Sequence, residues 1–231
     1  MYIVLWRDDM GILERKEKER IIRRNDVIDA AETLFMEKGF EQTTMDEIAK
    51  SAGFTKKTIY TYISSKDEIY MEIMLRGFNL LNKQIDESLE LHHYKSCIDN
   101  IKLLGMTYAK FSLEHKYYYR AITNYENKAI DFDQSNQGNQ SKLIESCYTA
   151  GQYSMHHLEN FISMGLERNE IIKNVDPKIM ALYLWSSMTG LINIIRKKEQ
   201  YVTVYFHENT DLILEEGLKL ILNSIINKNI N

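Results

Sequence analysis

The stretch TMDEIAKSAGFTKKTIYTYISSK, residues 44–66, decides the fold because it encodes two short helices joined through a glycine. Thr44 is followed three residues later by Glu47, which is the capping box that begins a helix. Gly53 ends that helix, since glycine accepts the left-handed backbone of a helix C-terminus. Thr55 can then cap the next helix. The spacing predicts helices over residues 45–52 and 56–63.

The second predicted helix has one apolar face and one basic face. Ile59 and Ile63 lie four residues apart and can be buried against the first helix, which turns Lys56, Lys57 and Tyr60 outward. A phosphate backbone attracts such a local excess of lysine whatever the base sequence. The pattern is typical of a helix-turn-helix that binds DNA, and the alternative is a solvated helical hairpin.

A further capping box decides between these two interpretations. Ser65 and Glu68 repeat the S-x-x-E pattern and predict the start of a third helix immediately after the pair. Three helix caps at this spacing favour the DNA-binding interpretation.

The N-terminal part of the chain resembles the TetR family of bacterial transcriptional regulators. The matching segments are VIDAAETLFMEKGF (27–40), TT (43–44), IAKSAG (48–53), TIY (58–60) and SK (65–66). Lys57 stands where the family often has glycine, and Tyr62-Ile63 where a His-Phe pair is frequent, and these differences concern the operator sequence rather than the fold. The resemblance implies a homodimeric repressor that binds a palindromic operator and is released by a small molecule.

Side-chain chemistry divides the expected DNA contacts into two groups. Hydroxyls, helix N-termini and ammonium groups suit phosphate oxygens, whereas lysines at the N-terminal end of a recognition helix can donate to guanine O6 and N7. The predicted phosphate contacts are Thr44, Thr55, Tyr60, Tyr62 and Lys66. The residues predicted to meet base edges are Lys56, Lys57 and Thr58.

The composition of the whole chain favours an all-α protein. Its 231 residues include 44% hydrophobic residues, one proline and ten glycines, whereas sheets need more turn residues. Further helices are predicted over residues 66–91, 97–114, 116–125, 140–167, 178–198 and 211–226, with a polar loop over 126–139. We expect a poorly ordered extension over 1–13, a three-helix helix-turn-helix DNA-binding domain over 14–65, and a helical ligand-binding and dimerisation domain over 66–231.

Charge is distributed unevenly along the chain. The net charge is −4, so DNA affinity has to come from local basic patches. Residues 14–24 carry six Lys or Arg and three Glu. This segment suits either an arm along a DNA groove or a solvated helix with internal ion pairs.

Aromatic residues of the C-terminal domain suggest a pocket. An aromatic lining with a few hydroxyls suits an amphipathic or aromatic small molecule, although aromatic residues at helical spacing also build ordinary cores. The predicted lining is Tyr108, Phe111, Tyr148, Gln152, Met155 and Trp185.

The last two predicted long helices carry more apolar surface than one chain can cover. Residues 179–195 are apolar around most of the helix circumference, so burial on two sides is implied. A partner helix pair is the natural cover. The predicted dimer contacts are Leu191, Ile195, Leu214, Leu218 and Ile221.

Other classes of function find little support. Cys97 and Cys147 lack the spacing of a metal site, and two adjacent histidines on a helix point about 100° apart and do not chelate alone. The sequence contains no nucleophile elbow, phosphate loop or paired-acid site, so we predict no enzyme, cofactor or metal. No apolar run approaches the roughly 20 residues of a membrane span, and no secretion signal is recognised, so a cytoplasmic protein is expected. Two rival functions stay open: a constitutive or architectural DNA-binding protein, and an enzyme with a vestigial DNA-binding head.

Overall fold

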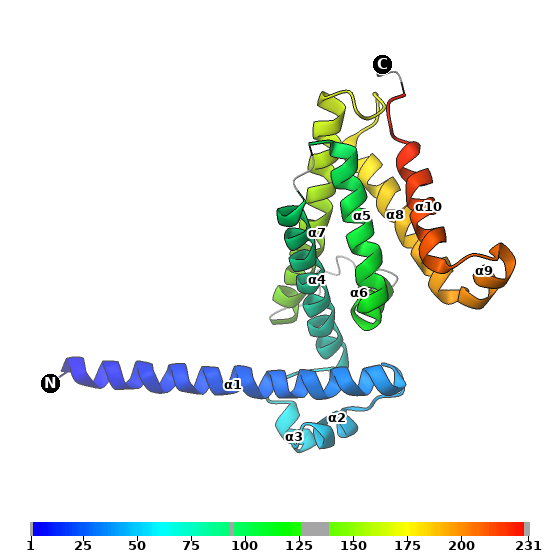
Figure 1. Ribbon diagram of the computed structural model, residues 1–231. Helices are drawn as coiled ribbons and strands as arrows, with labels where there is room; N and C mark the ends of the chain where they lie inside the picture. Colours follow the sequence, from blue (N-terminus) through cyan, green and yellow to red (C-terminus); the bar gives the residue numbers. More distant parts are fainter. Residues whose placement is uncertain (1, 93–94, 126–138, 229–231) are drawn as a thin grey trace. The chain divides into compact units, whose positions relative to one another are not determined.

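The chain is all-α, as the sequence predicts. The computed structural model describes residues 2–92, 95–125 and 139–228, and within them the only non-helical pairing is an isolated bridge between Ile171 and Ile226 (Figure 1). The helices are α1 (Tyr2–Lys38), α2 (Met45–Ser51), α3 (Lys56–Ile59), α4 (Lys66–Leu91), α5 (Cys97–Glu114), α6 (Lys116–Tyr125), α7 (Asn139–Glu167), α8 (Pro177–Lys197), α9 (Glu199–Phe206) and α10 (Thr210–Asn223).

Two compact units divide the chain. Among the described residues, the first comprises residues 2–76 and 139–144, and the second comprises residues 77–92, 95–125 and 145–228. Helix α4 therefore contributes to both units, whereas the sequence predicted a boundary at its start. Ion pairs between α1 and the first part of α4 explain this difference.

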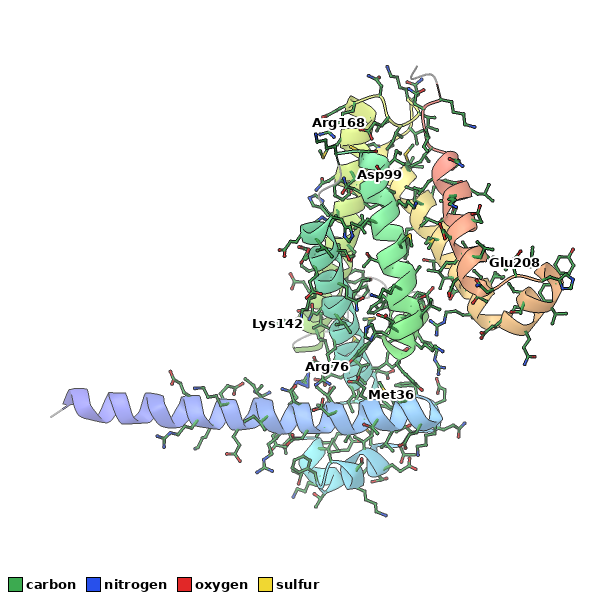
Figure 2. The ribbon with its side chains drawn as sticks, in the orientation of Figure 1. Met36, Arg76, Asp99, Lys142, Arg168 and Glu208 are labelled. Atoms are coloured by element: carbon green, nitrogen blue, oxygen red, sulfur yellow. The ribbon has the colours of Figure 1, made fainter. Side chains whose placement is uncertain are left out.

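These ion pairs form two reciprocal bridges, each built around one arginine. Arg24 of α1 donates to Glu68 and Glu72 of α4 at 2.8 and 2.5 Å. In the opposite direction, Arg76 of α4, which is labelled in Figure 2, donates to Asp29 and Glu32 of α1 at 2.6 and 3.0 Å. The bridges fix how α4 lies along α1 within the first unit.

The core of the first unit is aliphatic at its centre and aromatic at one end. The apolar side chains with no more than 1% exposure are Val27, Ile28, Ala31, Ile48, Ile59, Ile63, Ile69 and Met74. Phe40, in the turn after α1, contacts Phe35 and Tyr70 edge-on at 5.3 and 5.0 Å between ring centroids. These contacts hold α1, α2, α3 and the start of α4 together.

The second unit packs α5 against α6, α8 and α10, and packs α8 against α9 and α10. Two glycines permit close approach at this centre. A Cβ atom at Gly105 would lie 2.9 Å from Leu218, and one at Gly217 would lie 2.5 Å from Leu191. Leu218 is only 4% exposed, so it belongs to the core of its own chain.

Some predicted boundaries differ from the structure. Helix α3 is shorter than expected, because the backbone after Ile59 tightens into a turn in which Tyr62 donates to the Ile59 carbonyl. Helix α9 was not predicted. Helix α1 begins at Tyr2 and therefore includes most of the segment 1–13 that the sequence assigned to an extension. The predicted loop over 126–139 lies outside the described residues except Asn139, which begins α7.

Helix α8 is the one described helix that is long and apolar enough, by length and composition alone, to cross a membrane. The core helix of a soluble protein passes the same test, and α8 buries Met180, Leu184, Met188 and Ile192 against its neighbours. This packing assigns α8 to the helical core of the second unit.

Candidate nucleic-acid interface

The N-terminus of α2 is held by the predicted capping box. Thr44 Oγ1 accepts from the Glu47 backbone N–H at 3.3 Å, and Glu47 Oε2 accepts from the Thr44 backbone N–H at 2.9 Å. Glu47 also accepts a hydrogen bond from Lys38 of α1. The Lys38 contact, followed by the hydrogen bonds from Thr44, lowers the pKa of Glu47 from 4.5 to about 2. The carboxylate thus joins α1 to α2.

The turn between α2 and α3 depends on Gly53. This residue has φ +72°, a left-handed conformation that costs other residues about 1–2 kcal/mol. Thr55 then caps α3, accepting from the Thr58 backbone N–H at 3.2 Å. The two threonine hydroxyls lie 2.8 Å apart, so Thr58 takes part in the same cap.

Three predicted DNA-contacting side chains are exposed on α3 and its C-cap. Lys56, Lys57 and Tyr60 face solvent, with Tyr60 48% exposed. Lys56 donates to Asp46 of α2 at 2.8 Å, and this hydrogen bond raises the pKa of Lys56. Lys57 makes no ion pair within the described part of the chain, so its ammonium is the more available of the two.

Two further predicted contacts have structural partners. The Tyr62 ring is half-buried and lies 6.1 Å from the Phe54 ring. Lys66 donates to the backbone carbonyls of Phe40 and Thr43 at 2.8 and 3.0 Å, and lies over the Phe40 ring. Lys66 therefore holds the turn after α1, which differs from the free phosphate contact predicted from the sequence.

Glu68 and Arg23 make contacts in this region that the sequence pattern did not predict. Glu68 is 8% exposed and accepts from the Ser64 backbone N–H at 2.7 Å, so it ties the end of the α3 turn to Arg24 of α1. The Arg23 guanidinium lies 5.6 Å from the centroid of the Phe54 ring, directly before α3. The capping motif pointed to Glu68, whereas no local pattern pairs residues 23 and 54.

The second unit contains the predicted ligand-binding residues. Tyr108 is half-buried, with its hydroxyl 3.3 Å from Thr189 Oγ1 and its ring 5.6 Å from that of Tyr119. Phe111 is completely buried. Of the remaining predicted residues, Tyr148, Met155 and Trp185 are half-buried. Gln152 is exposed.

Polar groups that the sequence pattern did not reveal lie beside Tyr119. Its hydroxyl donates to Asn193 Oδ1 at 3.3 Å, and the Arg196 guanidinium lies 4.9 Å from its ring centroid. Burial lowers the pKa of the Arg196 guanidinium from its usual value. The signal in the sequence was weak: an asparagine and an arginine within the otherwise apolar segment of α8.

A second polar group lies where α4 meets the end of α5. Gln84 Nε2 lies 3.0 Å from His115 Nε2, and Gln84 Oε1 is buried without a hydrogen-bond partner in the described part of the chain. A buried acceptor of this kind is commonly satisfied by water or a ligand.

The predicted dimer residues fall into two groups. Ile195 and Leu218 are 5% and 4% exposed, so they pack within their own chain and the prediction that they contact a partner is corrected. Leu191, Leu214 and Ile221 are half-buried. Large exposed apolar side chains also occur on the last three helices: Ile179, Leu182, Tyr183 and Ile194 of α8, Tyr201, Val204, Tyr205 and Phe206 of α9, and Leu212 and Leu220 of α10.

Comparison with known proteins places the first unit among DNA-binding domains. Residues 27–73 match the model of "Bacterial regulatory proteins, tetR family". The chain is 37% identical over 78 residues to the biofilm operon icaADBC HTH-type negative transcriptional regulator IcaR of Staphylococcus epidermidis. That alignment covers 34% of this chain and 40% of the relative, so the chain matches less than half the length of this relative.

Solved structures resemble the fold over most of the chain. The TetR family transcriptional regulator PfmR from Thermus thermophilus has a TM-score of 0.61 at 18% identity, covering 85% of this chain and 97% of that one. The regulator AibR, solved in complex with isovaleryl coenzyme A and operator DNA, has a TM-score of 0.57 at 18% identity, covering 86% and 97%. At this level of identity the likeness concerns the fold alone.

Proposed function

Because this chain belongs to the TetR family of bacterial transcriptional regulators, we propose that it is a homodimeric repressor that binds a palindromic operator and is released by a small molecule. One observation carries the proposal: the capped α2–α3 turn presents Lys56, Lys57 and Tyr60 on one exposed face. Regulators of this kind are generally not enzymes.

The two lysines of α3 have different roles in the proposed complex. Lys57 is exposed at the N-terminal end of α3, where it would donate to guanine O6 and N7. Lys56 would exchange its hydrogen bond with Asp46 for one with a base or phosphate, since an exposed ion pair contributes little. Thr44, Thr55, Tyr60 and Tyr62 would position the helix through phosphate contacts, and Thr58 would meet a base edge beside the two lysines.

The proposed ligand site lies among α5, α6 and α8. Tyr108 and Tyr119 provide aromatic surface, whereas Asn193 and Arg196 provide hydrogen-bond and charge partners. An amphipathic or aromatic molecule would place its ring on the tyrosines and its polar end at Arg196. Tyr148, Gln152, Met155 and Trp185 would complete the proposed lining.

Release from DNA is proposed to pass through α4, which runs from one compact unit into the other. A ligand beside α5 and α6 would change the course of α4 and hence the separation of the two recognition helices in a dimer. Half-sites one turn of DNA apart require a separation of about 34 Å. A changed separation would therefore lower operator affinity.

Selection from a random DNA library tests the proposal directly. We expect the wild-type chain to enrich a palindromic sequence, and Lys57→Ala to bind that sequence with about 1–3 kcal/mol less free energy and with relaxed base preference. Lys50→Ala, an exposed lysine on α2, is the matched control and should keep the base preference. Failure of the wild type to enrich any sequence would refute operator binding.

One observation favours the constitutive DNA-binding protein as a second candidate. Phe111, predicted as a pocket wall, is completely buried, as expected of ordinary core packing. A thermal-shift screen separates the two candidates, because a released repressor requires a compound that both stabilises the protein and lowers its operator affinity. Stabilising compounds that leave operator affinity unchanged would favour the constitutive protein.

A further inference from the structure

Helix α1 extends well beyond the segment that matches the DNA-binding family. The match begins at residue 27, but α1 begins at Tyr2 and continues without a break to Lys38. Figure 1 shows the blue N-terminal part of α1 continuing past α2 and α3, which belong to the same compact unit. The side chains of residues 14–23 are exposed, so this part of the helix has no role in the core.

One face of this extension is basic and lies in line with the part of α1 that contacts the helix-turn-helix. Lys16, Arg20, Arg23 and Val27 follow one another at intervals of four, three and four residues, so they share a helix face. Val27 is completely buried in the first unit. The contact of Arg23 with the Phe54 ring places the same face beside the turn that leads into α3.

The existing partners of these cations hold them weakly. Arg20 pairs with Glu17 at 3.5 Å and Arg23 with Glu19 at 3.3 Å, and all four side chains are 44–66% exposed. Exposed pairs of this spacing contribute little stability, so a phosphate can replace the glutamates at small cost. Arg24 differs, because it is 22% exposed and committed to two carboxylates of α4.

We propose that Lys16, Arg20 and Arg23 form a second DNA-binding surface, which holds the phosphate backbone flanking each half-site. The surface rests on the operator binding proposed above and lengthens the contacted DNA beyond the reach of α3. From Arg23 to Lys16 the helix rises about 10 Å at 1.5 Å per residue, which corresponds to about three base pairs. The contact is independent of base sequence, since it involves phosphates only.

Lys18 provides a matched control for this surface. It is exposed on the same helix two residues from Lys16, but it points to the opposite side, since two residues turn a helix by about 200°. Lys16→Gln and Lys18→Gln remove the same charge from neighbouring positions. Because both side chains are exposed, both variants should keep the helicity and the melting temperature of the wild type.

The test measures operator affinity as a function of salt concentration. The probes are the library-selected operator with flanking base pairs and the same operator shortened by three base pairs at each end. For the long probe, we expect Lys16→Gln to reduce the log–log salt slope by about 0.9 per lost contact, or about 1.8 for two protomers. Lys18→Gln should leave the slope unchanged, and the short probe should remove the difference between Lys16→Gln and the wild type.

The outcomes separate this inference from the proposed function. Equal slopes for Lys16→Gln and the wild type on the long probe, or equal losses for Lys16→Gln and Lys18→Gln, would overturn the α1 surface while operator binding stands. A wild-type chain that selects no DNA would overturn the proposed function instead. Arg20→Gln gives an independent repeat on the same face and should also reduce the slope.

Discussion

At the scale of single residues, Glu47 joins two helices through its carboxylate. It accepts from the Thr44 backbone N–H and from Lys38, and these bonds lower its pKa from 4.5 to about 2. A carboxyl whose pKa is lowered by folding stabilises the folded state above its unfolded pKa, and this stabilisation is lost as the pH falls through the folded value. The stabilisation by Glu47 is therefore lost in a pH window between 4.5 and about 2.

This window gives the first prediction. Glu47→Gln should melt below the wild type at about pH 6, and the difference in melting temperature should shrink as the pH is lowered from about 4.5 towards 2. Thermal unfolding followed by circular dichroism at several pH values measures it. Glu41→Gln, an exposed carboxylate in the preceding turn, is the control. A difference that stays constant across this range would disprove the assigned role of Glu47.

Lys66 gives a second prediction at this scale. Removing its ammonium leaves the carbonyls of Phe40 and Thr43 without their donor. We expect Lys66→Met to lower the free energy of unfolding by about 1–3 kcal/mol in denaturant titrations. Lys50→Met removes an exposed lysine of α2 and should have almost no effect. Unchanged stability in Lys66→Met, together with a shallower salt slope for DNA, would restore the phosphate role predicted from the sequence.

At the scale of the element, α2 and α3 depend on the backbone of Gly53. A Cβ atom there would meet no atom within 4 Å, so only the left-handed φ of +72° opposes a side chain. Gly53→Ala should therefore destabilise the chain by about 1 kcal/mol. Gly53→Asn should cost less, since asparagine tolerates this conformation. Chemical denaturation of both variants measures the difference, and an equal loss in both would contradict a purely conformational cost.

The ease of predicting an element follows from where its determinants lie. The bounds of α5 were predicted to the residue, and those of α2 to within one residue, because the caps Ser96 and Thr44 act within one turn. Helix α9 was missed since it has no side-chain cap, and it follows α8 at Lys198 without proline or glycine. The predicted length of α3 was too great, because a continuing helix and a tight turn share the same residue pattern.

The candidate sites were predictable to different degrees for the same reason. The exposed lysines of α3 follow from local helix spacing. The contacts of Lys66 with Phe40 and of Arg23 with Phe54 join residues more than 20 positions apart, and local patterns do not encode them. Likewise, the apolar residues of α8 and α10 were recognised, but sequence spacing did not reveal that Leu218 faces Gly105 within its own chain.

At the scale of the whole molecule, the exposed apolar side chains of α8 and α10 define the dimer prediction. Ile194 and Leu220 are 57% and 71% exposed, and their burial would contribute about 25 cal/mol per Å² of apolar surface. We expect a stable dimer by sedimentation at micromolar concentration, and a folded monomer for Ile194→Glu combined with Leu220→Glu. Substitution of buried Leu218 would instead disturb the fold.

Leu91→Glu provides the control for this prediction. Leu91 lies at the end of α4 and is 77% exposed, so it tests the general effect of a new surface charge. It should leave the dimer intact. A wild-type chain that sediments as a monomer, or a double variant that remains dimeric, would show that another surface joins the protomers.

The reciprocal bridges between α1 and α4 also constrain how this protein can evolve. Each arginine depends on two acids of the other helix: Arg24 on Glu68 and Glu72, and Arg76 on Asp29 and Glu32. Loss of one acid leaves an arginine with a second partner, whereas loss of the arginine leaves two carboxylates facing each other. Substitutions of the two arginines should therefore be rarer among related proteins than substitutions of the four acids. Related proteins that lack one arginine should carry compensating changes at its acids.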